Sequence, residues 1–330
     1  MSSDVKKVSM RRVRAAQSLK SKLGLLIAFV LMLGVFAALT NGKFLGPKNM
    51  INLVRAVSLY APVAFAMTLC LIIGGIDLSV GALCAVASTY CAGLLVNYGV
   101  HTGLALAVGV GMATAMGLIN GLLISRTSMP PFIVTLSMMQ AARGVAYVYS
   151  AGKPIRTPAE FGSLANGYLF DYIPYPIIVM IVVMIAMMIL LNKTKFGRNC
   201  YTIGGNREAA RFSGINVRST TMWVYIISGF LCGICGVIWA SRLYSGQPTL
   251  GTGAEMNAIA SAIVGGTSMA GGSGTIGGTL LGAFVIQTLT SGLEFMDVPF
   301  YYKFIVQGAV IVIAVYIDIK RKEIAARRNS

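Results

Sequence analysis

One carboxylate stands out among the residues that could do chemistry, because it lies between two long apolar stretches. Asp77 follows Gly74 and Gly75 and precedes Gly81. A charged side chain in the middle of a bilayer costs about 2.5–3.5 kcal/mol, so such a group faces protein, water or a partner. Asp77 can line or gate a polar pathway, or it can cap the free N–H groups of the helix that follows it. We favour the cap, and the two roles can coexist.

Other polar side chains lie within or beside apolar stretches and are candidates for a substrate pathway: Asn120, Arg143, Gln247, Glu255 and Asn257. Amide and carboxylate groups of this kind suit the hydroxyl groups of a sugar. They are also common at the ends of loops, and Asn120 and Arg143 can simply bond to neighbouring helices. The sequence does not separate these explanations.

No pattern in the chain supports an enzyme. A GxxxxGK[ST] loop for ATP is absent, as is an HExxH zinc motif. His101 is the only histidine, which excludes a multi-histidine metal site. Five of the six cysteines lie in apolar stretches, where cysteine behaves as a small hydrophobic residue, and this includes the CxxC pair Cys232 and Cys235. We therefore expect no catalytic residue, no metal and no cofactor bound by this chain.

The composition sets the environment in which these residues are placed. Of 330 residues, 56% are hydrophobic and 11% are charged, against about 25% charged in an ordinary soluble domain. A spanning helix needs about 20 mostly apolar residues. The sequence predicts an all-α polytopic membrane protein with ten crossings, over 23–39, 54–73, 79–97, 103–125, 131–150, 174–192, 219–241, 257–270, 275–294 and 300–318.

The basic residues orient these crossings. The formal net charge is +17, and the Lys and Arg side chains cluster in residues 1–22, 193–218 and 320–330. Cytoplasmic loops of membrane proteins carry such an excess, so no nucleic acid is needed to explain it. The pattern predicts cytoplasmic segments at 1–22 and 320–330, a membrane domain over 23–319 and a cytoplasmic loop at 193–218. Stretch 23–39 is read as a retained first helix rather than a signal peptide. Eight crossings with two re-entrant segments would also satisfy the charges.

Two glycine-rich stretches resemble each other and indicate a possible internal repeat. Residues 72–81 (IIGGIDLSVG) are similar to residues 263–272 (IVGGTSMAGG), and each follows one apolar stretch and opens another. Transporters are often built from repeats whose unwound segments lie near the substrate.

A short helix is predicted inside the basic loop 193–218. Asn206 suits its N-cap, Glu208 suits its positive end, and Gly214 suits the residue after its C-terminus. A helix of about two turns is unstable alone. With Ala209 and Phe212 on one apolar face, it can dock into a groove of another protein, or it can lie on the chain's own cytoplasmic face.

Several stretches resemble one family of transport proteins. Residues 204–216 (GGNREAARFSGIN) resemble the coupling segment of ABC sugar-importer permeases of the ribose, galactose and arabinose type. Five further stretches resemble the same family, in the same order along the chain: 74–81 (GGIDLSVG), 131–136 (PFIVTL), 143–147 (RGVAY), 247–249 (QPT) and 258–268 (AIASAIVGGTS). Ribose-type permeases are the most similar, through 247–249 and 265–272 (GGTSMAGG).

The resemblance implies a permease subunit of an ATP-driven monosaccharide importer in the cytoplasmic (inner) membrane. Its partners would be a second copy of the chain, a cytoplasmic ABC ATPase that binds ATP and Mg²⁺, and an external sugar-binding protein. The family's coupling helix maps onto Asn206, Arg207, Glu208, Ala209, Ala210, Arg211, Phe212 and Gly214.

Two departures from the family's pattern are visible. The Leu-Pro that continues the coupling motif of other ABC permeases is missing, and Asn257 stands where ribose-type relatives usually carry aspartate. The alternative function is an ion-coupled secondary transporter of a small polar solute, with Asp77 as the ion site.

Overall fold

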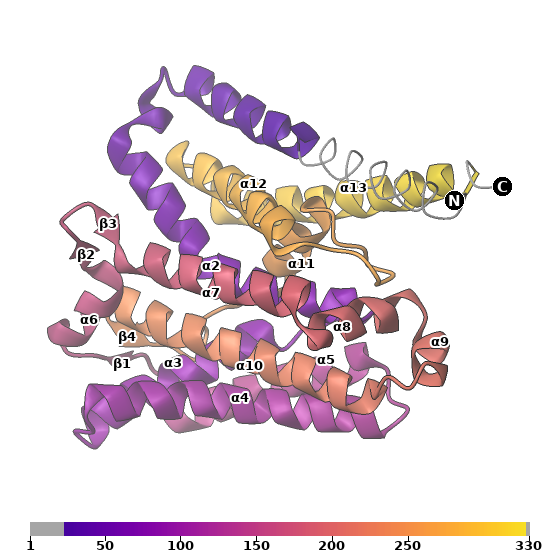
Figure 1. Ribbon diagram of the computed structural model, residues 1–330. Coiled ribbons are helices and arrows are strands. Elements are labelled where there is room, and N and C mark those ends of the chain that lie inside the picture. The colour runs from indigo at the N-terminus through magenta and orange to yellow at the C-terminus, as the bar shows by residue number, and fades with distance from the viewer. Residues whose placement is uncertain (1–22, 328–330) are drawn as a thin grey trace.

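The computed structural model describes residues 23–327, and within them the chain is almost entirely helical (Figure 1). Residues 1–22 and 328–330, which belong to the two predicted cytoplasmic ends, lie outside the described residues. Every predicted crossing contains a helix: Leu23–Leu39, α2 Pro47–Ile72, α3 Val80–Asn97, α4 Thr102–Arg126, α5 Pro131–Ser150, α7 Tyr175–Lys193, α10 Val217–Arg242, α11 Ala254–Val264, α12 Ile276–Phe295 and α13 Phe300–Arg327. The described residues hold 6 helices that are long and apolar enough to cross a membrane: α2, α3, α4, α7, α10 and α12.

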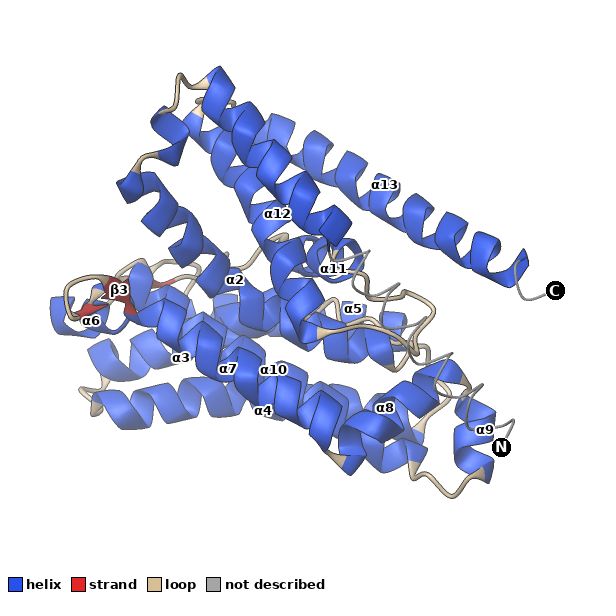
Figure 2. Ribbon diagram, turned by 45° about the horizontal axis from the view of Figure 1, so that its top comes forward, coloured by secondary structure: helices blue, strands red, loops and turns tan. Residues whose placement is uncertain are grey.

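The smaller elements lie at the two ends of the bundle. Helix α6 and two short antiparallel sheets are at one end, and helices α8 and α9 are at the other (Figures 1 and 2). The bounds are η1 Lys43–Leu45, β1 Ile155–Arg156, α6 Ala159–Asn166, β2 Tyr168–Leu169, β3 Ile173–Pro174, α8 Lys195–Gly205, α9 Arg207–Phe212 and β4 Ser245–Gly246. Strand β1 pairs with β4, and β2 pairs with β3.

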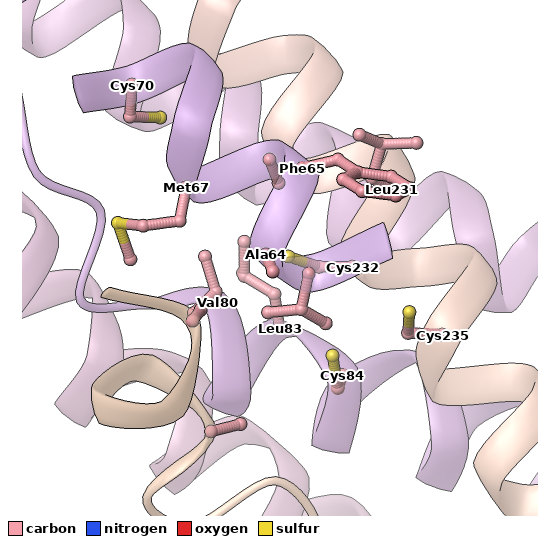
Figure 3. Packing of buried hydrophobic residues seen from close by; sticks show 14 of the residues in the cluster. Ala64, Phe65, Met67, Cys70, Val80, Leu83, Cys84, Leu231, Cys232 and Cys235 are labelled. Atoms are coloured by element: carbon pink, nitrogen blue, oxygen red, sulfur yellow. The ribbon is translucent and has the colours of Figure 1, made fainter. Parts of the chain in front are cut away.

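Helices α2, α3 and α10 form the centre of the bundle. Their apolar side chains interdigitate in Figure 3, where Phe65 and Met67 of α2 lie near Leu83 of α3 and Leu231 of α10. Helices α10 and α4 approach closely because Gly229 faces Gly117, and a Cβ on Gly117 would stand 3.0 Å from the Cα of Gly229. Small residues permit such backbone approach in membranes.

The cysteines belong to this apolar interior. All six are free and buried, and Cys84, Cys232 and Cys235 lie among the core side chains of Figure 3. The CxxC pair is therefore part of the packing between α3 and α10, as its apolar surroundings predicted.

The predicted helix over 257–270 is wrong in its bounds. Helix α11 begins earlier, at Ala254, and ends at Val264, and Gly266 then adopts a left-handed φ of 88°. Eleven residues of α-helix rise only about 16 Å, roughly half of the 30 Å hydrocarbon core. The preceding segment 245–253 runs along α3, because Gly246 packs on Ser88 and Gly251 packs on Gly81, seven residues away along that helix. A segment of successive turns followed by a helix of 11 residues thus takes the place of the predicted continuous helix.

A second break separates α2 from α3. Residues 73–79 are not helical, and Gly74 adopts a left-handed φ of 79°. Both breaks close with the same hydrogen bonds: Gly74 N–H to Leu71 O (2.9 Å) and Gly75 N–H to Cys70 O (2.9 Å) after α2, and Gly266 N–H to Ile263 O (2.8 Å) and Thr267 N–H to Ala262 O (2.9 Å) after α11. This capping pattern satisfies carbonyls that a helix end leaves free. In these hydrogen bonds Gly74 corresponds to Gly266, whereas the alignment of 72–81 with 263–272 pairs Gly74 with Gly265. The two comparisons therefore differ by one residue.

Candidate translocation and coupling sites

The Asp77 carboxylate lies fully buried in the break between α2 and α3 and accepts three hydrogen bonds. Its Oδ1 accepts from the backbone N–H of Ser79 (3.0 Å) and from the Ser79 hydroxyl (2.6 Å), and its Oδ2 accepts from the Ser228 hydroxyl of α10 (2.7 Å). Buried carboxylates require such donors. The N-cap residue of α3 is Ser79. Asp77 therefore holds the cap residue in place, but the donors to its carboxylate are Ser79 and Ser228 rather than N–H groups within α3, so the predicted N-cap role of Asp77 is wrong.

Asn120 extends this network to a third helix. Its Nδ2 group on α4 donates to the Ser79 hydroxyl (3.0 Å), while its Oδ1 atom is buried without a hydrogen-bond partner among the described residues. Thr135 of α5 adds a fourth connection by donating to the carbonyl of Ile76 (3.1 Å). The break after α2 is therefore tied to α4, α5 and α10 by polar side chains.

Arg143 fixes the non-helical segment that leads into α11. Its Nη1 group on α5 donates to the carbonyls of Pro248 (2.6 Å) and Leu250 (2.7 Å). Carbonyls of non-helical backbone at membrane depth need a partner inside the protein, and Arg143 provides it. Gln247 of this segment donates its backbone N–H to the Ser88 hydroxyl of α3 (3.3 Å).

Glu255 joins the two groups of polar residues. It lies half-buried in the first turn of α11 and interacts electrostatically with Arg143. A Cβ on Gly81 would stand 3.0 Å from Glu255 Oε2, so the carboxylate lies beside the N-terminus of α3, two residues from Ser79. Asn257 is half-exposed two residues further along α11. The structure thus brings Asp77, Asn120 and Glu255 together at the N-terminus of α3 and attaches Arg143 to the segment before α11, whereas Gln247 lies beside Ser88, further along α3. Asp77 and Asn120 are buried, and the other four predicted pathway residues are partly accessible.

The predicted short helix exists as α9. Asn206 Oδ1 accepts from the N–H of Ala209 (2.9 Å) as the N-cap, and Gly214 follows the helix with a φ of 79°. Ala210 is fully buried, whereas Phe212 is 87% exposed. Helix α9 therefore rests on its own chain through Ala210 and presents Phe212 outward.

A polar cavity of about 530 Å³ lies beside α9. Four arginines line it, from the end of α4, from α9 and from the start of α10: Arg126, Arg207, Arg211 and Arg218. Glu208 also lines it, and among the described residues no ion pair joins that carboxylate to any of the four arginines. The cavity is strongly basic and suits acidic groups.

The sequence reasoning missed the hydroxyl groups that hold Asp77. Ser79 and Ser228 are common residue types inside apolar helices, where a hydroxyl often bonds to its own backbone. Ser228 has no sequence signal that distinguishes it from Ser261, which donates to Asn257 O of its own helix (2.7 Å). Only the fold brings Ser228 to a residue 151 positions away.

Comparisons with known proteins place the chain in a family. The family model described as "Branched-chain amino acid transport system / permease component" matches residues 49–315. The chain is 42% identical to the ribose import permease protein RbsC of Bacillus subtilis, over 92% of this chain and 94% of that protein. It is 38% identical to RbsC of Escherichia coli K12 (90% and 93% covered) and 34% identical to the L-arabinose ABC transporter permease protein AraH of Azospirillum brasilense (91% and 88% covered). No solved structure matches.

The matches cover most of the chain, from the start of α2 to the middle of α13, and therefore include both helix breaks, the six polar residues and α9. A transport permease also accounts for the apolar helices and for the polar groups at membrane depth. The chain belongs to this family of transport-system permease components and is a multi-pass membrane subunit of an ABC transporter.

Proposed function

We propose that the chain is the permease subunit of an ATP-driven importer for a monosaccharide, a ribose-like pentose or a related hexose. The 42% identity to a ribose import permease over nearly the whole chain carries this proposal. Similar relatives are named for ribose, xylose, L-arabinose and fructose, which are all monosaccharides. An external binding protein would deliver the sugar, and a separate ATPase subunit would bind ATP and Mg²⁺.

The arrangement of the helices supports ten crossings with both ends in the cytoplasm. In Figure 1, the start of helix Leu23–Leu39 and the end of α13 lie toward the same end of the bundle as α8 and α9. The basic residues of 193–218 are at this end, as expected for a cytoplasmic face. The eighth crossing would consist of the non-helical segment 245–253 and α11.

The group of polar residues around the N-terminus of α3 suits an uncharged polar solute. Arg143 and Glu255 have opposite charges and interact, so together they add no net charge, while their remaining donors and acceptors can bond to sugar hydroxyls. Broken helices near the centre of the membrane are a recurrent way to build such a site. Gln247 and Asn257 would contribute amide groups. Asp77 and Asn120 would support the site through their hydrogen bonds to Ser79.

A second copy of the chain would complete this site. Gln140 is exposed at the middle of α5, and Asn257 is half-exposed on α11. Polar side chains at that depth face protein or water rather than lipid. A dimer that brings together two α5 and α11 faces would enclose a polar pathway between the subunits.

The α9 face would bind the ATPase subunit. Phe212 projects from it, and the basic cavity beside it suits acidic side chains of a partner. Exposed aromatic residues beside charged groups are typical centres of protein interfaces.

These partners are tested by extracting the protein gently from its native membrane and identifying the copurifying proteins by mass spectrometry. A P-loop ATPase in stoichiometric amount, and a soluble sugar-binding protein that rebinds in the presence of its sugar, are expected. If the permease comes out alone and moves sugar in vesicles that contain an ion gradient but no ATP, the ion-coupled alternative replaces this proposal.

A further inference from the structure

Helix α8 contacts both helix breaks at one point, where three backbone segments meet. A Cβ on Gly204 of α8 would overlap the carbonyl oxygen of Ile72, at the end of α2. That same oxygen accepts a hydrogen bond from the N–H of Gly272 (2.9 Å), in the segment that follows α11. We call the meeting of Ile72, Gly204 and Gly272 the glycine contact.

The contact is built from backbone on all sides. A Cβ on Gly204 would also stand 2.5 Å from the nitrogen of Gly272, and a Cβ on Gly271 would stand 2.7 Å from the carbonyl oxygen of Gly204. Close-packed interiors resist deformation and transmit strain. Because no flexible side chain lies between the segments, a displacement of Gly204 must move Ile72 and Gly272.

Tyr201 provides a second connection between the same elements. Its hydroxyl donates to the carbonyl of Gly274 (2.8 Å). Tyr201 lies three residues before Gly204, so the two residues share one face of α8. Helix α8 is therefore attached at two points to the segment that follows α11.

The other end of α8 is continuous with α9. Asn206 closes α8 by donating its backbone N–H to Thr202 O (3.1 Å), and its side chain opens α9 by accepting from Ala209 N–H (2.9 Å). A single residue thus caps both helices. Movement of α9 is passed to Gly204, two residues away from Asn206, with little backbone freedom in between.

Beyond the glycine contact, both breaks lead to the candidate substrate site. Ile72 is followed by the segment that holds Asp77, whereas α11, which ends just before Gly265, begins at the turn that carries Glu255. A shift at the glycine contact therefore acts on both halves of the polar site at once.

We propose that Gly204 and Tyr201 are positioning residues that convert movement of α9 into movement of the two helix breaks, and so open and close the sugar pathway. This inference rests on the proposed function, since the movement of α9 would come from ATP hydrolysis on the partner subunit. Packed elements of this kind change between discrete arrangements rather than bending continuously.

The two glycines at the end of α8 allow a matched test. Gly204→Ala introduces a methyl group into the contact, whereas Gly205→Ala introduces the same group into open space, with nothing within 4 Å of its Cβ. Tyr201→Phe removes only the hydrogen bond to Gly274 O. Each variant is assembled with the ATPase and binding protein in proteoliposomes, and the number of sugar molecules transported per ATP hydrolysed is measured.

Overpacking at Gly204 is expected to lower this ratio about tenfold, and loss of one hydrogen bond in Tyr201→Phe is expected to lower it about fivefold. Gly205→Ala should keep the wild-type ratio. A variant that is merely less stable loses transport and sugar-stimulated hydrolysis together, and leaves the ratio unchanged. Unchanged ratios in Gly204→Ala and Tyr201→Phe would therefore overturn the inference.

Two further outcomes are separable. If Gly204→Ala does not assemble, Tyr201→Phe alone decides the inference, because it adds no volume to the contact. If the wild-type complex itself transports sugar without hydrolysing ATP, the proposed function fails, and this result is independent of the variants.

Discussion

Ser228 of α10 donates a hydrogen bond of 2.7 Å to the Asp77 carboxylate, and this bond joins the break after α2 to the helix that follows α9. Asp77 is fully buried, and the other two bonds to its carboxylate come from Ser79. The long-range donor is therefore Ser228. Together with Asn120 of α4 and Thr135 of α5, this uncharged side chain ties the break to the helices around it.

Replacing Ser228 by alanine should destabilise the protein while leaving its partners bound. A hydrogen bond to a charged group contributes about 1.5–3 kcal/mol, and its loss leaves one oxygen of Asp77 without a side-chain donor. Thermal unfolding of the purified permease in detergent measures the effect as a lower Tm. Ser137→Ala is the matched control, because the exposed Ser137 hydroxyl bonds only to Ile133 O of its own helix. Equal Tm values for the two variants would contradict this role for Ser228.

Arg143→Met should abolish transport and destabilise the segment before α11. The substitution leaves the carbonyls of Pro248 and Leu250 without their donor, at a cost of about 1–3 kcal/mol for each buried unpaired group. Arg143→Lys keeps the charge, but its side chain is shorter than that of arginine and its ammonium group reaches the two carbonyls less well, so intermediate transport is expected. Uptake rates at matched expression measure both changes. Wild-type uptake in Arg143→Met would remove this residue from the pathway.

Phe212→Ala should weaken binding of the ATPase subunit without affecting the fold, because the ring is 87% exposed. Loss of an aromatic anchor at an interface costs about 2 kcal/mol or more, which is roughly a 30-fold weaker complex. The amount of ATPase that copurifies with the permease measures the loss of binding. Phe170→Ala is the control, since Phe170 is 80% exposed in the turn between β2 and β3, at the opposite end of the bundle. Loss of the ATPase in both variants, or in neither, would argue against an interface at α9.

Glu208→Arg should abolish uptake while the permease still folds and reaches the membrane. Glu208 is exposed in the first turn of α9, so the change costs the fold little, yet it reverses the charge at the positive end of that helix. Sugar uptake and membrane abundance are compared in the same cells. Normal uptake at normal abundance would remove α9 from the mechanism.

Cys200 of α8 should resist alkylation at neutral and mildly alkaline pH. Burial raises the pKa of its thiol to about 12, and only the thiolate reacts rapidly with maleimides. The thiol should therefore stay protonated and unreactive up to about pH 10. Peptide mapping after exposure to N-ethylmaleimide measures the modification, with denatured protein as the positive control. Rapid modification of Cys200 in the folded protein would show that α8 does not hold its packed position.

Much of the fold follows from the sequence, because lipid imposes a length and a composition on every crossing. The apolar stretches located the helices, and Asn206 and Gly214 located α9 through their capping preferences. The bounds of the helix over 257–270 were wrong because the chain turns at Gly251, Gly253 and Gly266, which have left-handed φ angles, and an apolar composition does not reveal where those turns fall.

The polar site was predictable only in part. Asp77 and Arg143 stand out because charges are costly at membrane depth. The hydrogen-bond donors to Asp77 do not stand out in the sequence, since Ser79 and Ser228 are ordinary residues in such helices. Likewise, Gly204 has the same sequence surroundings as Gly205, and only the three-dimensional approach of Ile72 distinguishes the two.

The most direct test of the central claim is uptake of radiolabelled ribose by proteoliposomes that contain the permease, the copurified ATPase and the loaded binding protein. Uptake is predicted to require hydrolysable ATP on the ATPase side and to persist when proton and sodium gradients are collapsed. Other binding proteins of the same organism, each loaded with its own pentose or hexose, are tested in the same proteoliposomes to compare further substrates. Uptake that continues without ATP and stops when an ion gradient is removed would contradict the account.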